Sequence, residues 1–76
     1  MSFKQPSREL VSSIREMFPA GTKVRLNYTS DPYTKMSYGE LGAVSFVDDS
    51  GTIFIDWDCG SKLGMVYGED SISIMN

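Results

Sequence analysis

The sequence predicts a mainly β domain with one N-terminal α-helix, and two observations carry this prediction. Apolar residues recur with a helical period only near the start of the chain, and from Thr22 onward they alternate with polar residues, as in half-buried strands. Turns rich in glycine and aspartate then separate five short segments at intervals of about ten residues, a spacing typical of a small barrel or sandwich. We expect a single domain over residues 1–76, with a helix over about 7–18 and a small five-stranded barrel over about 22–75.

The helix is predicted over residues 7–18, which read SRELVSSIREMF. Ser7 could cap its N-terminus, or Pro6 could occupy its first position. Pro19 disfavours helical backbone at the residue before it and therefore ends the element. One apolar face at helical spacing is expected from Leu10, Ile14, Met17 and Phe18.

The five strands are predicted at residues 22–28, 41–47, 52–57, 62–67 and 71–75. Period-two alternation places one set of side chains on a shared face in four of them. This set is Val24, Leu26, Tyr28, Ile53, Ile55, Trp57, Leu63, Met65, Tyr67, Ile72 and Ile74. The glycines at 39, 42, 60, 64 and 68 are interpreted as turn and bend residues that let the strands curl. The segment 29–40 has no clear period, and a loop of that length in a compact domain is often functional.

The charge of the chain is unevenly distributed. The net charge is −3, yet six of the seven basic residues lie within residues 1–35. Residues 36–76 contain seven acidic residues and one basic residue, Lys62. Phosphate backbones bind clustered Lys and Arg, so the composition argues against a nucleic-acid partner. A basic patch could form only from Lys4, Arg8, Arg15, Lys23 and Arg25.

Composition also bears on location. No apolar run reaches the length of about 18 residues that a membrane span needs, and the N-terminus lacks the apolar core of a secretory signal. A single cysteine, Cys59, allows no internal disulfide. We therefore expect a cytoplasmic protein without a membrane partner.

Catalytic and metal chemistry find little support. The chain has no histidine, so it offers no Ser-His or Cys-His pair and no imidazole base. No residue activates Cys59, whose neighbour Asp58 disfavours a thiolate. Asp48, Asp49, Asp56 and Asp58 could converge on a hard cation, but their spacing lacks further ligands, and roles in turns are favoured. We predict no enzyme activity, no cofactor and no metal.

The order of residues resembles a family of small proteins known only as domain of unknown function number 4314. The resemblance runs through FPAGTKVRL, then DPY, then GELGAVSFVDDSGTIFIDWDCGSKLGMVYGEDSI, and the W-D-x-G-S-x-L element is its most specific part. Cys59 stands where that family usually has Asn or Asp, which implies a turn residue. MSYGELG stands where prolines are frequent, which implies a different shape of the preceding loop. The resemblance implies an SH3-like or KOW-like barrel of bacterial or phage origin, with no established activity.

We therefore expect a non-enzymatic binding module for a protein partner. Tyrosine joins an apolar ring to a polar tip and suits a groove that receives an extended peptide. The groove is predicted from Tyr28, Tyr33, Met36, Tyr38 and Tyr67, with Asp31 and Asp58 attracting a basic partner. Tyr33 could instead fold back and cap the barrel.

Three alternatives remain open at this point. The acidic C-terminal half could make the protein a phage or mobile-element inhibitor that occupies a host site. KOW-like barrels often contact RNA, so weak nucleic-acid binding is a second alternative. Self-association through Val66 or Phe54, on the face opposite the core residues, would make the protein a homo-oligomer.

Overall fold

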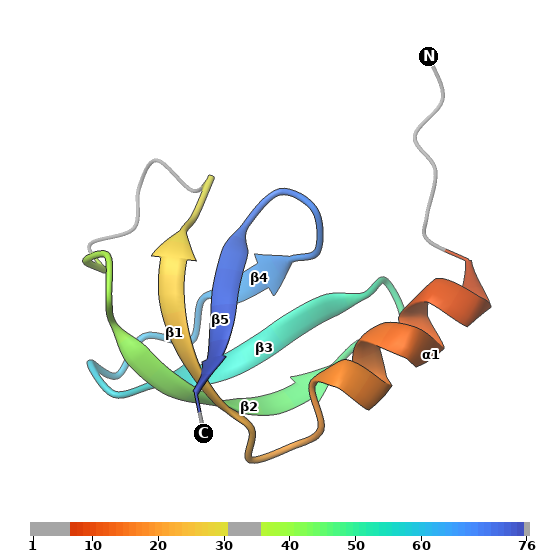
Figure 1. Cartoon of the computed structure of the whole chain (residues 1–76), viewed down its shortest axis with the longest axis horizontal. Coiled ribbons are helices and arrows are strands. Elements are labelled where there is room, and N and C mark those ends of the chain that lie inside the picture. The colour runs from red at the N-terminus through yellow and green to blue at the C-terminus, as the bar shows by residue number, and fades with distance from the viewer. Residues whose placement is uncertain (1–6, 31–35, 76) are drawn as a thin grey trace.

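The computed structural model describes residues 7–30 and 36–75, and within them one helix precedes five strands (Figure 1). The elements are α1 (Arg8–Met17), β1 (Lys23–Tyr28), β2 (Leu41–Val47), β3 (Thr52–Trp57), β4 (Gly64–Val66) and β5 (Ser71–Met75). All strand pairs are antiparallel and form one sheet in the order β4-β3-β2-β1-β5. The predicted fold class, mainly β with one N-terminal helix and five strands, is confirmed.

The sheet is strongly twisted but does not close in its strand pairing. Strands β1 to β4 follow one another as a meander, and β5 returns to pair with β1, an order consistent with an SH3-like barrel. In Figure 1, β1 and β5 run steeply across the direction of β2 and β3, so the sheet curls around one face. Among the described residues, β4 and β5 remain the two edges of this sheet.

Helix α1 begins at the predicted cap. The Ser7 side-chain oxygen accepts a hydrogen bond from the Leu10 backbone N–H at 3.1 Å, which satisfies one of the free amides at the helix start. Val11 and Ile14 are buried, whereas Leu10 is 37% and Met17 is 42% exposed. The predicted apolar face was therefore wrong at Leu10 and Met17, because the helix turns its Val11–Ile14 row toward the sheet.

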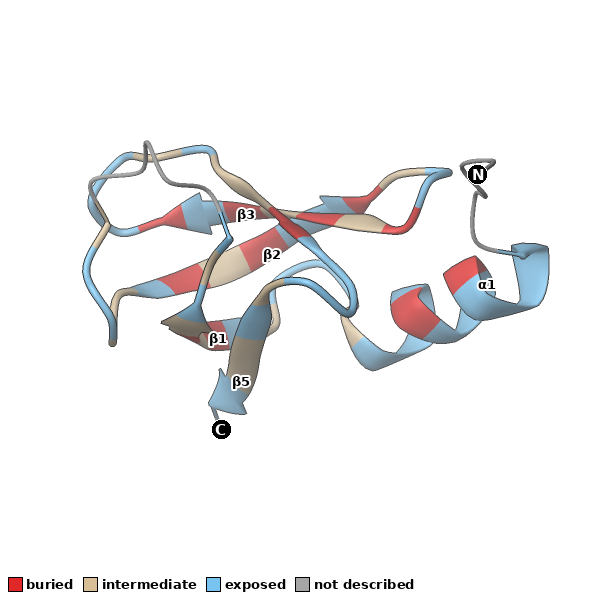
Figure 2. Cartoon of the chain, turned by 90° about the horizontal axis from the view of Figure 1, so that it is seen from above, coloured by how far each residue is buried: buried red, intermediate tan, exposed pale blue. Residues whose placement is uncertain are grey.

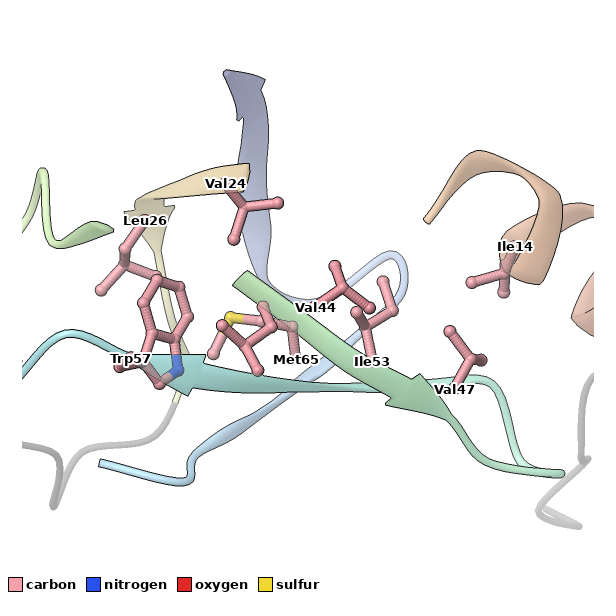
Figure 3. Packing of buried hydrophobic residues seen from close by; sticks show 9 residues of the cluster. Ile14, Val24, Leu26, Val44, Val47, Ile53, Trp57 and Met65 are labelled. Atoms are coloured by element: carbon pink, nitrogen blue, oxygen red, sulfur yellow. The ribbon is translucent and has the colours of Figure 1, made fainter. Parts of the chain in front are cut away.

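The core lies on the concave face of the sheet and is closed by the helix. Figure 3 shows Trp57 beside Leu26 at one end of this core and Ile14 facing Val47 at the other. Ile53, Ile55 and Trp57 are buried, as their alternation predicted. The buried cluster consists of Ile14, Val24, Leu26, Val44, Val47, Ile53, Ile55, Trp57 and Met65.

Register shifts determine the face on which two exposed side chains lie, and one of these side chains differs from the prediction. The β1–β5 pairing shifts between Leu26 and Tyr28, and Tyr28 is 60% exposed although simple alternation placed it with the core residues. The β2–β3 pairing shifts between Val44 and Phe46, which leaves Phe46 on the outer face. There its ring stacks on Phe54 with the ring centres 4.8 Å apart.

The last two predicted strands are shorter or more open than expected. Strand β4 contains only Gly64–Val66, and Tyr67 beyond it is 49% exposed instead of pointing inward. Strand β5 has no buried residue, and Ile74 is 47% exposed (Figure 2). Both strands are at sheet edges, where no further strand covers their side chains.

Two of the glycines interpreted as turn or bend residues lie within strands. Gly39, Gly60 and Gly68 have positive φ, as turns require. Gly42 is buried in β2, where a Cβ atom would lie 2.9 Å from both the Asp56 carbonyl oxygen and the Trp57 ring. Gly42 therefore lets the Trp57 indole pack directly on the backbone of β2.

Candidate functional site

A hollow of about 310 Å³ opens on the sheet surface where β1, β2 and β5 meet; we name it the Leu41 hollow. Lys23 pairs with Ala43 on one side and with Met75 on the other, so three strands contribute neighbouring side chains. Small residues at 42 and 43 keep the floor of the hollow low. Its lining residues are Lys23, Val24, Leu41, Gly42, Ala43, Asp58 and Met75.

The Leu41 hollow combines apolar walls with two opposite charges. Leu41 is 46% and Met75 is 38% exposed, so two large apolar side chains face solvent at the same hollow. Lys23 and Asp58 are exposed, and neither forms an ion pair within the described part of the chain. The hollow can thus receive an apolar group while charged or polar groups beside it meet Lys23 or Asp58.

Backbone hydrogen bonds fix the residues at the edge of this hollow. The Asp58 backbone N–H donates to the Leu41 carbonyl oxygen at 2.8 Å, which holds the β3–β4 turn against the start of β2. In the preceding turn, the Gly39 N–H donates to the Leu26 carbonyl oxygen at 2.8 Å. Tyr38, which is 75% exposed, lies in that turn three residues before Leu41.

A second group of predicted residues lies around the β4–β5 turn. Tyr28 pairs with Ser71 at the start of β5, and Tyr67 forms a bridge with Asp70. Beside Tyr67 lies a smaller hollow of about 130 Å³. It is lined by Phe18, Ile53, Met65, Val66, Tyr67, Gly68, Asp70, Ser71 and Ile72.

The predicted groove residues are therefore brought together as two groups. Asp58 lines the Leu41 hollow, and Tyr38 lies in the turn just before Leu41. Tyr28 and Tyr67 belong to the other group, because they pair with the consecutive residues Ser71 and Asp70. Met36 is half-buried and packs against the core cluster. Tyr33 and Asp31 lie outside the described residues.

The sequence did not predict Lys23, Leu41, Ala43 and Met75 as site residues. Lys23 and Met75 meet only because β5 pairs with β1, a contact between strands far apart in the sequence that no local pattern reveals. One signal was available in the sequence. In SISIM, Met75 lies on the same strand face as Ser71 and Ser73, which indicates a side chain directed to solvent.

The aspartates considered as cation ligands do not converge on one point, and three of them bond to different parts of the fold. Asp48 accepts bonds from the Ser50 and Thr52 backbone N–H groups within its own turn. Asp49 pairs with Arg15 at 2.8 Å, and Asp56 pairs with Lys62 at 2.6 Å. In residues 7–30 and 36–75 no three His, Cys, Asp or Glu side chains are grouped as metal ligands. Cys59 is exposed and unpaired with another cysteine in the turn where it was predicted.

Two aspartates have lowered pKa values. Burial raises the pKa of Asp70, but bonds from the Val66 and Ser30 backbone and from the Ser30 hydroxyl outweigh it and hold that pKa below 3.8. Burial likewise raises the pKa of Asp48, and the bonds from Ser50 and Thr52 outweigh it. Both carboxylates stabilise turns, and neither lines the Leu41 hollow.

Fold and site together define a small, twisted antiparallel β-domain with a helix over one end and a mixed apolar and charged hollow on its outer face. A family model, described as domain of unknown function (DUF4314), matches residues 7–75. The chain belongs to this family, as its resemblance predicted. Searches of curated proteins and of solved structures gave no match. Within the described residues no helix is long and apolar enough to cross a membrane.

Proposed function

We propose that the protein is a non-enzymatic binding module whose Leu41 hollow receives a side chain of a protein partner. The observation that carries this proposal is that exposed Leu41 and Met75 line a hollow that Lys23 and Asp58 also line. Exposed apolar side chains grouped beside a concavity are typical of interaction sites.

The chemistry of the hollow suggests an extended peptide with one apolar residue. Its apolar walls would bury that residue, and Asp58 at the edge would favour a lysine or arginine nearby. Tyr38, three residues before Leu41 in the chain, exposes a ring and a hydroxyl, a combination common at protein interfaces. The acidic balance of residues 36–76 would speed the approach of a basic partner.

The two alternative binding functions receive less support from the charge arrangement. Arg15 and Lys62 are each paired with an aspartate, which reduces the positive charge that these two side chains can offer to a phosphate backbone. The same pairs neutralise Asp49 and Asp56, which weakens an acidic surface that would imitate a nucleic acid. A bacterial or phage origin and a cytoplasmic location stay predictions.

The test is to replace Tyr38 by a photo-crosslinking phenylalanine derivative in cells of the native host. We expect one dominant crosslinked protein, and we expect Leu41→Ser and Asp58→Lys variants of the same probe to lose it. The matched control carries the probe at Glu16, an exposed helix position away from the hollow. Equal crosslinking from both positions, or full retention in Leu41→Ser, would refute the proposed surface.

The partner identified in this way is then purified and its affinity measured by calorimetry. Asp58→Lys should weaken binding more at low salt than at high salt, since screening removes the charge contribution. Cys59→Ser, in the same turn, should leave the affinity unchanged and controls for distortion of that turn.

A further inference from the structure

The two edges of the sheet differ in how their backbone groups are used. Strand β4 has three residues, and the backbone groups of its last residue, Val66, form hydrogen bonds to the following turn. The Val66 N–H donates to the Asp70 carboxylate at 2.8 Å, and the Val66 carbonyl oxygen accepts bonds from the Glu69 and Asp70 N–H groups. The β4 edge therefore offers little to another strand.

The β5 edge is open. Leu26 uses its N–H and its carbonyl oxygen toward Glu40 and Gly39, so it makes no backbone bond to Ile72, its partner in β5. Bonded and non-bonded pairs alternate in an antiparallel ladder. The Ile72 and Ile74 backbone groups consequently point away from β1, and no hydrogen bond outside the ladders involves them in the described part of the chain.

The composition of β5 leaves this edge unprotected. Natural edge strands are usually blunted by charge, by proline or by short length. Strand β5 reads SISIM, with five residues, no charge and no proline. The open edge thus lacks charge and proline, and its ladder with β1 is irregular only between Leu26 and Tyr28.

Side chains beside the open edge are incompletely covered in the same place. Ile74 pairs with the fully buried Val24 and so lies on the core side of the sheet, yet it is 47% exposed. Next to Ile72 lies the hollow of about 130 Å³, with Phe18, Ile53 and Met65 among its lining residues. A further strand beside β5 would cover Ile74 and could place an apolar side chain against this hollow.

We propose that this further strand is β5 of a second copy of the chain, paired antiparallel about a two-fold axis at Ser73. Ile72 of each copy then lies opposite Ile74 of the other. The backbone N–H and C=O groups of these residues point away from β1, so the two pairs can form four hydrogen bonds between the copies. The Ile74 side chain of one copy covers Ile72 of its neighbour on the core side. The interface shares only Met75 with the Leu41 hollow, because Lys23 and Ala43 lie on the opposite face from Ile72 and Ile74.

Charge favours this self-pairing. The end of β5 at Met75 lies next to Lys23 in β1. In the antiparallel arrangement that end meets the start of β5 of the second copy, which follows the exposed residue Glu69. The basic end of each edge thus faces the acidic end of the other. Since the β4 edge is closed, pairing stops at two copies and does not continue into a fibre.

The first test is the mass of the purified chain by sedimentation equilibrium over a wide range of concentration. We expect a monomer–dimer equilibrium between 8.5 kDa and twice that mass. Ile74→Lys should weaken the dimer by more than about tenfold, because a lysine would be desolvated against Ile72. The control, Leu10→Lys, places the same charge on an exposed apolar residue of α1 that lines neither hollow, and it should leave the dimer unchanged. A monomer at every concentration, or a dimer lost in the Leu10 variant and kept in Ile74→Lys, overturns the proposal.

Amide hydrogen exchange of the wild type tests the same interface without a substitution. The Ser73 and Met75 amides bond β1 and should be protected at every concentration. The Ile72 and Ile74 amides should exchange fast in dilute solution and gain protection as the dimer forms. If their exchange does not depend on concentration, the β5 pairing is wrong even if the chain dimerises by another surface, such as Val66 or Phe54.

Discussion

The Asp70 carboxylate accepts two hydrogen bonds from Ser30, one from its backbone N–H at 2.6 Å and one from its hydroxyl at 3.0 Å, across 40 positions of the chain. Its second oxygen accepts from the Val66 N–H at 2.8 Å. One side chain therefore joins the segment after β1 to the end of β4 and the start of β5. In a domain of this size, such a set of hydrogen bonds adds stability that a small core cannot supply alone.

Asp70→Asn should lower the free energy of unfolding by about 1–3 kcal/mol, because hydrogen bonds to a charged acceptor are stronger than those to a neutral amide. Urea denaturation followed by Trp57 fluorescence measures the loss. Glu69→Gln is the matched control, since it removes the same charge from an exposed neighbour. A loss of equal size in both variants would mean that net charge, and not the hydrogen bonds, is responsible.

Stability should fall in acid because of Asp48 and Asp70. Their pKa values in the folded chain lie below the ordinary value of 3.8, so both carboxyls ionise more readily folded than unfolded. Their stabilising contribution is complete above that value and is lost as the pH falls through the lower folded pKa values. Melting temperatures below about pH 5 should therefore drop more steeply for the wild type than for an Asp48→Asn, Asp70→Asn double variant. Parallel curves for the two proteins would contradict this assignment.

The strands show where sequence patterns suffice. Ile53, Ile55 and Trp57 alternate without interruption, and all three are buried as predicted. In β2 the register shifts after Val44, so Phe46 is exposed and Val47 is buried. A bulge depends on the partner strand and leaves no reliable mark in the strand itself, which is why alternation misplaced Tyr28 in β1 and gave no face for Phe46 in β2.

The helix shows a second limit. The predicted face of Leu10, Ile14, Met17 and Phe18 fits a helical period, but so does the set of Val11, Ile14 and Phe18, and only the second set faces the protein. Which row is buried depends on how the helix lies against β2, a tertiary contact. The Leu41 hollow was not predictable for a related reason, since Lys23 and Met75 meet only through the pairing of β1 with β5.

Gly42→Ala should destabilise the protein by about 1–3 kcal/mol, as overpacking of a core does. The new Cβ would lie 2.8 Å from the Ile55 side chain and 2.9 Å from the Asp56 carbonyl oxygen, and a backbone atom cannot easily move away. Gly64→Ala is the comparison, because its Cβ would meet only the Thr52 and Phe54 side chains on the outer face. Urea midpoints should fall more for the first variant, and the reverse order would contradict the tight packing of Trp57 on β2.

Arg15 should matter more for stability than its ion-pair partner. Its Nη2 lies 2.8 Å from an Asp49 oxygen that is fully exposed, and such pairs contribute little. Its Nε also donates to the half-buried Val47 carbonyl oxygen at 3.2 Å, which joins the helix to the end of β2. Arg15→Ala should cost about 1 kcal/mol, whereas Asp49→Ala should leave the urea midpoint unchanged. Equal effects would assign the stabilisation to the ion pair.

Ala43→Leu tests the Leu41 hollow by filling it. Ala43 lines the hollow on the outer face, so a larger apolar side chain there can occupy the free space without entering the core. We expect the unfolding free energy to change by less than about 1 kcal/mol, as for other surface substitutions, while affinity for the crosslinked partner falls at least about tenfold. Val66→Leu adds apolar bulk on β4 outside the hollow and should bind normally. Normal binding by Ala43→Leu, with the fold intact by circular dichroism, would mean that the partner contacts another surface.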